Sequence, residues 1–208
     1  MTRKPTEVRQ AEIVGAAMKI IAAKGGKHFT AQLIADEVGM TAGGIFRHFA
    51  SMDEIVGAVI DRMEEVLFRG FPPSAEDPWD RLREFFGHRV RVMAEHPDIS
   101  GILLSDHLAH LGGKKPAARV KELKRRSRQF VTQCLQEAAD SGAMASDVSV
   151  DAATVLLLGA ILAVGHSTTR VPDETETTRL TAEVWSAIEK MRYSPATESP
   201  RQEGGHGR

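Results

Sequence analysis

The sequence predicts an all-α protein of about nine helices, with an N-terminal three-helix helix-turn-helix domain followed by a helical ligand-binding and dimerisation domain. Two observations predict this fold class. Val, Ile and Leu recur at helical spacing, and almost no segment alternates strictly between apolar and polar residues. Glycines and prolines also divide the chain into segments of helical length, for example at Gly25-Gly26, Gly70–Pro73 and Gly112-Gly113.

Composition places the chain among globular proteins without a membrane partner. Of its 208 residues, 42% are apolar and 26% charged, and no stretch reaches the ~18 uninterrupted apolar residues of a spanning helix. No apolar segment follows the basic start of the chain, so we expect a cytoplasmic protein without a signal peptide. Residues 1–50 contain seven Lys and Arg against four acids, although the whole chain has a net charge of −1. This asymmetry favours a nucleic-acid-binding module in residues 1–50.

The helix-turn-helix domain is predicted over residues 1–50. A first helix spans 6–24, with apolar residues on one face. Thr30 caps a short second helix that ends at residue 38, and Gly39 follows at the point where a helix end favours positive φ. A short helix, a tight turn with glycine and a second short helix are the layout of a helix-turn-helix.

The third predicted helix, 41–49, has the composition of a helix that contacts DNA. Gly43 and Gly44 each cost about 1 kcal/mol of helix stability relative to alanine, but they let the backbone approach a groove or a phosphate closely. Ile45 and Phe49 are expected to point inward. Arg47 could bind a guanine edge through two hydrogen bonds. The residues expected to face outward are Thr41, Ala42, Gly44, Arg47 and His48.

A fourth predicted helix, within residues 51–69, connects the two domains. Ser51 caps it, and Asp53 and Glu54 lie in its first turn, where the helix dipole favours acids. Ser51 and the free N–H groups at the start of this helix could hold a phosphate. A small helical bundle with a glycine-rich turn is the alternative interpretation that the physical arguments leave open.

The stretch FTAQLIADEVGMTAGGIFRHFASMDEIVGAVI resembles the DNA-binding region of the TetR (tetracycline repressor) family. The resemblance covers roughly residues 7–62, and the rest of the chain matches only in length and helix count. It implies a homodimer that binds a palindromic operator in double-stranded DNA and releases it when a small molecule enters the second domain. The positions that match in register are Ala35, Gly39, Met40, Thr41, Gly43, Ile45, Phe46, His48, Phe49, Ser51, Asp53 and Ile55.

The resemblance also implies which residues contact DNA. Phe46 stands where the family usually has tyrosine, so the hydroxyl that would bond a phosphate is absent. Met52 stands where many members have a lysine that contacts a phosphate, which implies weaker non-specific affinity or compensation from Arg3, Lys4 and Lys27. The DNA-binding residues that we expect are Lys4, Lys27, Thr30, Gln32, Thr41, Ala42, Gly43, Gly44, Phe46, Arg47, His48 and Ser51.

The effector-binding and dimerisation domain is expected over residues 51–193. After the connecting helix, further helices are predicted at roughly 77–95, 98–110, 116–141, 149–169 and 173–192. Residues 194–208 lack apolar side chains that could anchor them and are predicted to be disordered.

The segment 152–165 is apolar nearly all round and therefore needs partners on most sides, and we expect it to be too short for a bilayer span. With the last helix, it could form the core of one subunit. A two-fold four-helix dimer interface is preferred, because two DNA-reading units need a fixed spacing and the resemblance implies this pair of helices. The interface residues that we expect are Leu156, Gly159, Leu162, Ala163, Val184 and Ile188.

The middle helices are rich in Leu, Ile, Met and Phe. Most of these side chains must form the core, and a subset is expected to line a cavity for an apolar, uncharged or weakly polar effector. No cofactor is predicted. The residues that we expect at the effector are Phe85, Phe86, Met93, Leu103, His107 and Phe130.

Other functions remain open at this point. His88, His96, His107 and His110 leave a metal-responsive regulator possible, and Cys134 a redox-responsive one, but neither has partners at a fixed spacing, so no metal site is assigned. No phosphate-binding loop or catalytic motif is present, so we do not expect an enzyme. A small helical enzyme and an effector-independent DNA-architectural protein are the alternatives of a different class. The basic run 121–128 is interpreted as a solvated helix face.

Overall fold

Helices make up almost all of the computed structural model within the residues that it describes, which are 5–25, 29–105, 108, 111, 114–168 and 174–192. The β pairing among these residues is limited to an isolated bridge between Met144 and Arg192. The predicted all-α fold class is therefore confirmed. The helices in the described ranges are α1 (Thr6–Lys24), α2 (Ala31–Val38), α3 (Ala42–Ile45), α4 (Met52–Leu67), α5 (Pro78–Glu95), α6 (Pro97–Leu104), α7 (Lys114–Asp140), α8 (Val150–Thr168) and α9 (Glu174–Glu189).

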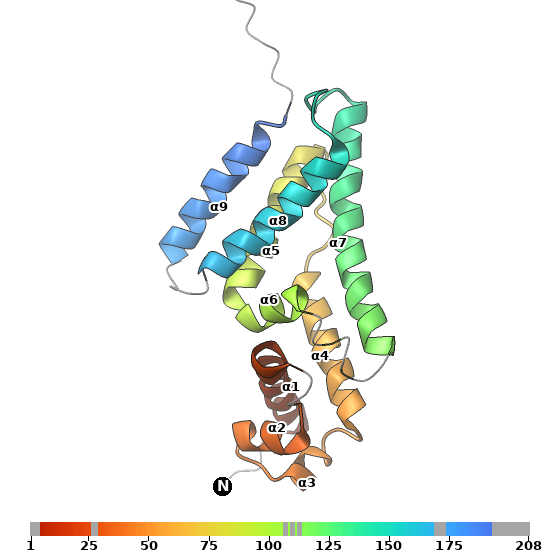
Figure 1. Ribbon diagram of the computed structural model, residues 1–208, viewed down its shortest axis with the longest axis vertical. Helices are drawn as coiled ribbons and strands as arrows, with labels where there is room; N and C mark the ends of the chain where they lie inside the picture. The colour runs from red at the N-terminus through yellow and green to blue at the C-terminus, as the bar shows by residue number, and fades with distance from the viewer. Residues whose placement is uncertain are drawn as a thin grey trace, which may run out of the picture.

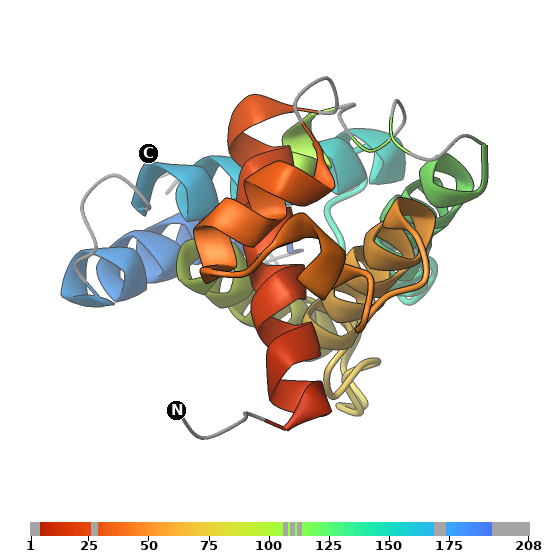
Figure 2. The same cartoon turned by 90° about the horizontal axis from the view of Figure 1, so that it is seen from below.

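The helices form two groups that α4 joins (Figure 1). α1, α2 and α3 lie together at one end of the molecule, and α4 leads from them toward α5–α9. α8 packs against α5 and α7, and α9 lies beside α8 on the side away from α7. Figure 2 views the molecule from the end at which α3 lies, with α2 and α3 in front of the other helices. This end therefore presents α2 and α3 to solvent.

Side-chain caps set the helix starts that the sequence predicts. Thr30 Oγ1 accepts a hydrogen bond from the Leu33 N–H at 3.3 Å at the start of α2. Gly39 ends α2 with a φ of 66°, a conformation that glycine adopts without strain. Ser51 Oγ accepts from the Glu54 N–H at 3.2 Å at the start of α4. The bounds of α1, α2 and α4 agree closely with the predicted ones.

α3 is shorter than the predicted helix 41–49, which is corrected here to Ala42–Ile45. Beyond it, the hydrogen bonds join residues three apart: the Arg47 N–H donates to the Gly44 carbonyl at 3.3 Å, and the His48 N–H to the Ile45 carbonyl at 2.9 Å. Two consecutive glycines disfavour a longer α-helix. Residues 46–48 therefore form a tight turn that follows α3.

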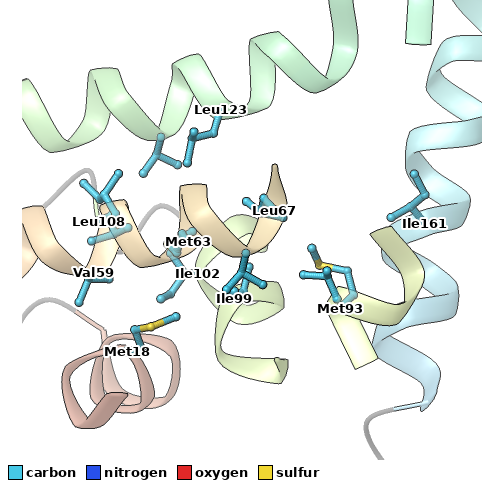
Figure 3. Close-up of a cluster of buried hydrophobic side chains, with 14 of the residues drawn as sticks. Met18, Val59, Met63, Leu67, Met93, Ile99, Ile102, Leu108, Leu123 and Ile161 are labelled. Carbon is cyan, nitrogen blue, oxygen red and sulfur yellow. The ribbon is translucent and has the colours of Figure 1, made fainter. Parts of the chain in front are cut away.

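One apolar core extends without interruption from α1 to α8. Figure 3 shows Met18 of α1 beside Val59 and Met63 of α4 within this core. α6 packs closely on α1: a Cβ added to Gly101 of α6 would lie only 3.2 Å from the Cβ of Ala22 on α1. The N-terminal helices thus share a core with the second group, and the domain boundary at residue 50 stays a prediction.

α8 is longer than the apolar segment recognised in the sequence. Its residues 150–167, with a mean hydropathy of 1.7, are long and apolar enough to cross a membrane by length and composition alone. The expectation that this helix is too short to span is therefore wrong. About a third of the window, 33%, is buried in the protein, and one such helix is weak support for a span, because core helices also meet this criterion.

Helices α5 and α7–α9 also lie close to their predicted positions. The predicted helix 98–110 is described only in part, and α6 ends at Leu104. The predicted disordered tail 194–208 lies outside the described residues.

Candidate nucleic-acid interface and ligand pocket

The turn that follows α3 presents a cation and an aromatic ring at the end of the molecule. Thr41 Oγ1 accepts a hydrogen bond from the Gly44 N–H at 3.1 Å and so caps α3. Phe46 is 46% exposed, and Arg47 is also exposed. The Arg47 guanidinium has no hydrogen bond or ion pair with any described residue. Both side chains are therefore available to a partner.

A hydrogen bond from α1 holds this turn in place. The Gln10 side chain donates from Nε2 to the His48 carbonyl at 2.9 Å, across 38 residues of sequence. Ile45 and Phe49 point inward as predicted, since they are 0% and 5% exposed. No local pattern in the sequence predicts the role of Gln10, because the contact depends on how α1 crosses the turn.

Three of the residues expected to face outward, Ala42, Gly44 and His48, do not do so fully. Gly44 is buried, and a Cβ at this position would lie 3.2 Å from both Met40 Cε and Thr41 Oγ1. The prediction that Gly44 approaches DNA is therefore wrong: its lack of a side chain serves the packing of α3. His48 is half-buried, and its Nδ1 is buried without a hydrogen-bond partner. Thr41 and Gly43 are exposed, and Ala42 is half-buried.

The remaining residues expected at DNA lie around this turn. Thr30 and Gln32 are exposed on α2, and Gln32 Nε2 donates to the Asp36 carboxylate at 2.7 Å. Ser51 is exposed, but its hydroxyl caps α4 and the Glu54 carboxylate accepts from the Ala50 N–H. The cap occupies the Ser51 hydroxyl and the Glu54 N–H, two of the groups that we expected to hold a phosphate. Lys4 and Lys27 lie outside the described residues.

One face of α8 exposes a line of apolar and small residues. Val155 is 55% exposed and Leu156 61% exposed. Gly159 and Ala163 continue this face and are also exposed. We call these four residues the α8 outer face. The opposite side of α8 is buried against the rest of the chain, with Ala153, Leu157 and Ile161 in the core.

The other residues expected at a dimer interface pack inside the chain to different extents. Leu162 and Val184 are half-buried and pack against the core. Ile188 is only 7% exposed, and its neighbour Trp185 lies against Phe86 with ring centroids 5.6 Å apart. The placement of Ile188 in an interface is therefore wrong, because its side chain packs into the core of its own protomer.

A pocket of about 310 Å³ lies where the segment between α4 and α5 meets α7. Of the predicted effector residues, Phe130 lines it, and Phe85 lies behind Phe130 with ring centroids 5.1 Å apart. Most of its wall was not predicted from the sequence, because residues from distant segments form it. The lining residues are Phe71, Pro72, Pro73, Arg81, Arg126, Gln129, Phe130, Gln133 and Cys134.

The other predicted effector residues do not line this pocket. Phe86 and Met93 are buried elsewhere in the core, at 1% and 2% exposure. Leu103 is half-buried on α6, and His107 lies outside the described residues. The prediction that these side chains surround one cavity together with Phe130 is therefore wrong for the pocket described here.

The basic run on α7 is not wholly a solvated face. Arg126 forms an ion pair with Glu64 of α4, and its guanidinium carbon lies 3.9 Å from the centroid of the Phe68 ring. Arg125 pairs with Glu122 of its own helix at 2.6 Å. Arg126 thus joins α7 to α4, whereas its neighbour faces outward.

The environment of Cys134 disfavours a redox sensor. The side chain is 1% exposed, and burial raises the pKa of its thiol to about 11. A thiol with so high a pKa supplies little thiolate, the form that reacts with oxidants. The described residues contain no group of three or more His, Cys, Asp and Glu able to hold a metal ion. His107 and His110 lie outside those residues.

Comparison with known proteins places this geometry in a family. Residues 13–59 match the family described as bacterial regulatory proteins, tetR family. Residues 75–166 match the tetracyclin repressor-like C-terminal domain. The two matches together span the α2–α3 unit, α4 and the helices around the pocket.

Sequence similarity to individual proteins is consistent with these family matches. The chain is 24% identical to the HTH-type transcriptional repressor KstR2 of Mycobacterium tuberculosis (strain ATCC 25618 / H37Rv) over 146 residues, which are 69% of this chain and 72% of the relative. It is 28% identical to the nucleoid occlusion factor SlmA of Alteromonas mediterranea over 133 residues, which are 62% of this chain and 67% of the relative.

The fold also matches a solved structure. The structure of the ketosteroid transcriptional regulator KstR2 of Mycobacterium tuberculosis superposes with a TM-score of 0.72 at 18% identity, over 90% of this chain and 96% of that chain. The family matches, the relatives and the helix-turn-helix geometry agree with one another. The chain belongs to the TetR family of bacterial regulatory proteins and is a ligand-responsive, DNA-binding transcriptional regulator.

Proposed function

We propose that this protein is a cytoplasmic repressor that binds a near-palindromic operator as a homodimer and leaves it when a small organic effector occupies the second domain. The observation on which the proposal chiefly depends is the exposed turn after α3, where Arg47 has no partner among the described residues and Phe46 is 46% exposed. We call residues 46–48 the recognition turn. A guanidinium exposed on this turn is suited to hydrogen bonding with the edge of a guanine base. The similarity to a transcriptional repressor supports repression rather than activation.

The α8 outer face supports the homodimer. Val155 and Leu156 are large apolar side chains in solvent, at 55% and 61% exposure, in a helix whose other side is buried. Gly159 and Ala163 on the same face allow a second helix to approach closely. Two copies related by a two-fold axis would bury this face on both chains and hold two α3 turns at a fixed spacing.

The pocket between the α4–α5 segment and α7 supports the response to an effector. Its volume of about 310 Å³ falls at the lower end of the range for small-molecule sites. Arg126 in its wall is ion-paired to Glu64 of α4, the helix that begins next to the α3 turn. An effector that displaces this ion pair would favour an arrangement of α4 with lower operator affinity.

Substituting Arg47 tests the proposed recognition turn. Random duplexes are first selected for binding, and the selected sequence is expected to be a near-palindrome whose half-sites lie about 34–36 Å apart. Arg47→Ala should then weaken binding by about 1–3 kcal/mol and relax base preference at one position per half-site. Titration of labelled duplexes, each with one altered base pair, measures both effects.

Arg128→Ala is the matched control, because Arg128 is an exposed arginine on α7, away from α3. It should leave affinity and base preference unchanged. If Arg47→Ala also changes neither, the recognition turn is wrongly assigned. Binding that depends on salt but shows no base preference would instead favour the DNA-architectural alternative.

A further inference from the structure

Arg89 of α5 is buried without an acidic partner. The residue is 3% exposed, and its Nη2 donates to Ser127 Oγ at 3.2 Å. Its Nε has no hydrogen-bond partner, and no described acid forms an ion pair with it. The guanidinium carbon lies 4.5 Å from the centroid of the Phe68 ring and 4.9 Å from that of Phe85. Ring faces attract a cation, but they do not neutralise its charge.

A second guanidinium, that of Arg126, lies over the Phe68 ring together with the guanidinium of Arg89. Arg126 is 3.9 Å from the centroid of the Phe68 ring. Burial and, second, the nearby charge of Arg126 lower the pKa of Arg89 to about 9, so Arg89 is still largely cationic at neutral pH. Burying like charges close together is unfavourable unless an anion compensates them.

The acids nearby are too few to balance these cations. Glu64 of α4 is shared, because it pairs with Arg126 and lies 3.7 Å from Arg119. Asp61 pairs with Arg119. Two carboxylates thus face three guanidinium groups, and Arg89 is the one left without a carboxylate. The α4–α7 contact therefore has an excess of positive charge.

The pocket opens onto this excess charge. Arg126 is in its wall, and Arg81, the other arginine of the wall, is already paired with Glu137. Phe130 of the wall lies against Phe85, on which Arg89 is stacked, with ring centroids 5.1 Å apart. The rest of the wall combines rings and prolines of the α4–α5 segment and α7 with the amides of Gln129 and Gln133. A ligand there would meet an apolar side, polar amides and the guanidinium of Arg126.

From this arrangement we infer that the pocket binds an amphipathic organic anion, with its apolar body against Phe71 and Phe130 and its anionic group at Arg126. The inference deepens the proposed function and rests on it, since it names the class of effector. It also replaces the expectation of an uncharged or weakly polar effector. The bound anion competes with Glu64 for Arg126 and so loosens α4 from α7, which run side by side (Figure 1).

The test compares ligands that share one alkyl chain. Octanoate, octyl phosphate and 1-octanol are titrated into the full-length protein by calorimetry. Charge-assisted hydrogen bonds to an arginine should make at least one anion bind roughly tenfold or more tightly than the alcohol. Comparing the affinities of octanoate and octyl phosphate shows whether the pocket prefers a carboxylate or a phosphate group. Arg126→Gln should remove the preference for the anion, whereas Arg125→Gln, the exposed neighbour, should keep it.

Glu64→Gln is expected to have the opposite effect on the affinity for the anion. It removes the competing carboxylate without changing the size of the side chain, so the anion should bind several-fold more tightly. Thermal unfolding of each variant checks that the fold is intact. The inference is overturned if no anion binds better than 1-octanol, or if Arg126→Gln keeps the preference.

Operator binding is measured on the same samples. If the protein binds its selected duplex but shows no preference for an anion, only the present inference fails. If it binds no duplex, the proposed function itself fails. Supporting results would include release of the duplex by the preferred anion and retention of the duplex by Arg126→Gln at the same anion concentration.

Discussion

Leu156→Asp is expected to convert the proposed homodimer into a monomer and to weaken operator binding roughly 100-fold or more. In the protomer the side chain is 61% exposed, so the substitution removes little from the core of the chain. In a two-fold interface, the new carboxylate would face the same apolar patch of the second copy. A buried charge without a partner costs about 3–5 kcal/mol. Loss of the dimer also removes the gain from binding two half-sites at once, which is typically about 10²–10⁴-fold.

Sedimentation equilibrium measures the oligomeric state, and titration of the selected duplex measures affinity. Leu104→Asp is the matched control, because Leu104 is 53% exposed but lies at the end of α6, away from the α8 outer face. That variant should remain a dimer with unchanged affinity. A Leu156→Asp protein that stays dimeric would show that the copies meet elsewhere. Leu156 is preferred to Leu162 for this test, since Leu162 is half-buried in its own protomer.

Gly165→Ala is expected to lower the free energy of unfolding by about 3 kcal/mol, the upper part of the usual range for overpacking. A Cβ on Gly165 of α8 would lie 2.2 Å from the Cβ of Met93 on α5, and 3.5 Å from its Cα. These atoms belong to or adjoin the backbone, so only a movement of one helix relieves the overlap. The close crossing of α5 and α8 therefore requires glycine at this position.

Urea unfolding at a fixed protein concentration measures the change, because the stability of a dimer depends on concentration. Gly87→Ala is the control: Gly87 lies inside α5, and a Cβ there would have no atom within 4 Å. This variant should be as stable as the parent or more stable by up to about 1 kcal/mol. Equal stabilities of the two variants would contradict the crossing distance in the structure.

The helix ends were predictable because their signals are local. Thr30, Thr41 and Ser51 each accept a hydrogen bond from an N–H three residues ahead, so the residue type and its place in the sequence are sufficient. The same is true of Gly39, whose φ of 66° follows from its place after α2. These signals, with the motif that they frame, determined the fold class and the position of the recognition turn.

Which side chains point to the core and which to solvent was less predictable where a helix is short or uniformly apolar. Gly44 was expected outside but is buried, because α3 is a single turn whose packing depends on Met40. Periodicity also cannot orient α8, since apolar residues occur on all its sides. Only the positions of α5 and α7 decide that Leu157 faces the core and Leu156 faces solvent.

The ligand pocket required the tertiary structure. Its wall combines Phe71 and Arg81 with Phe130, which is far from them in sequence. Arg89 resembles any other arginine of an amphipathic helix, and its burial results from Phe68, Phe85 and Ser127 of other turns and helices. The sequence by itself determined the helices, their caps and the family motif, because those depend on neighbours along the chain. The tertiary structure alone decided which charges are buried and which apolar face is left exposed, because both depend on how distant helices pack.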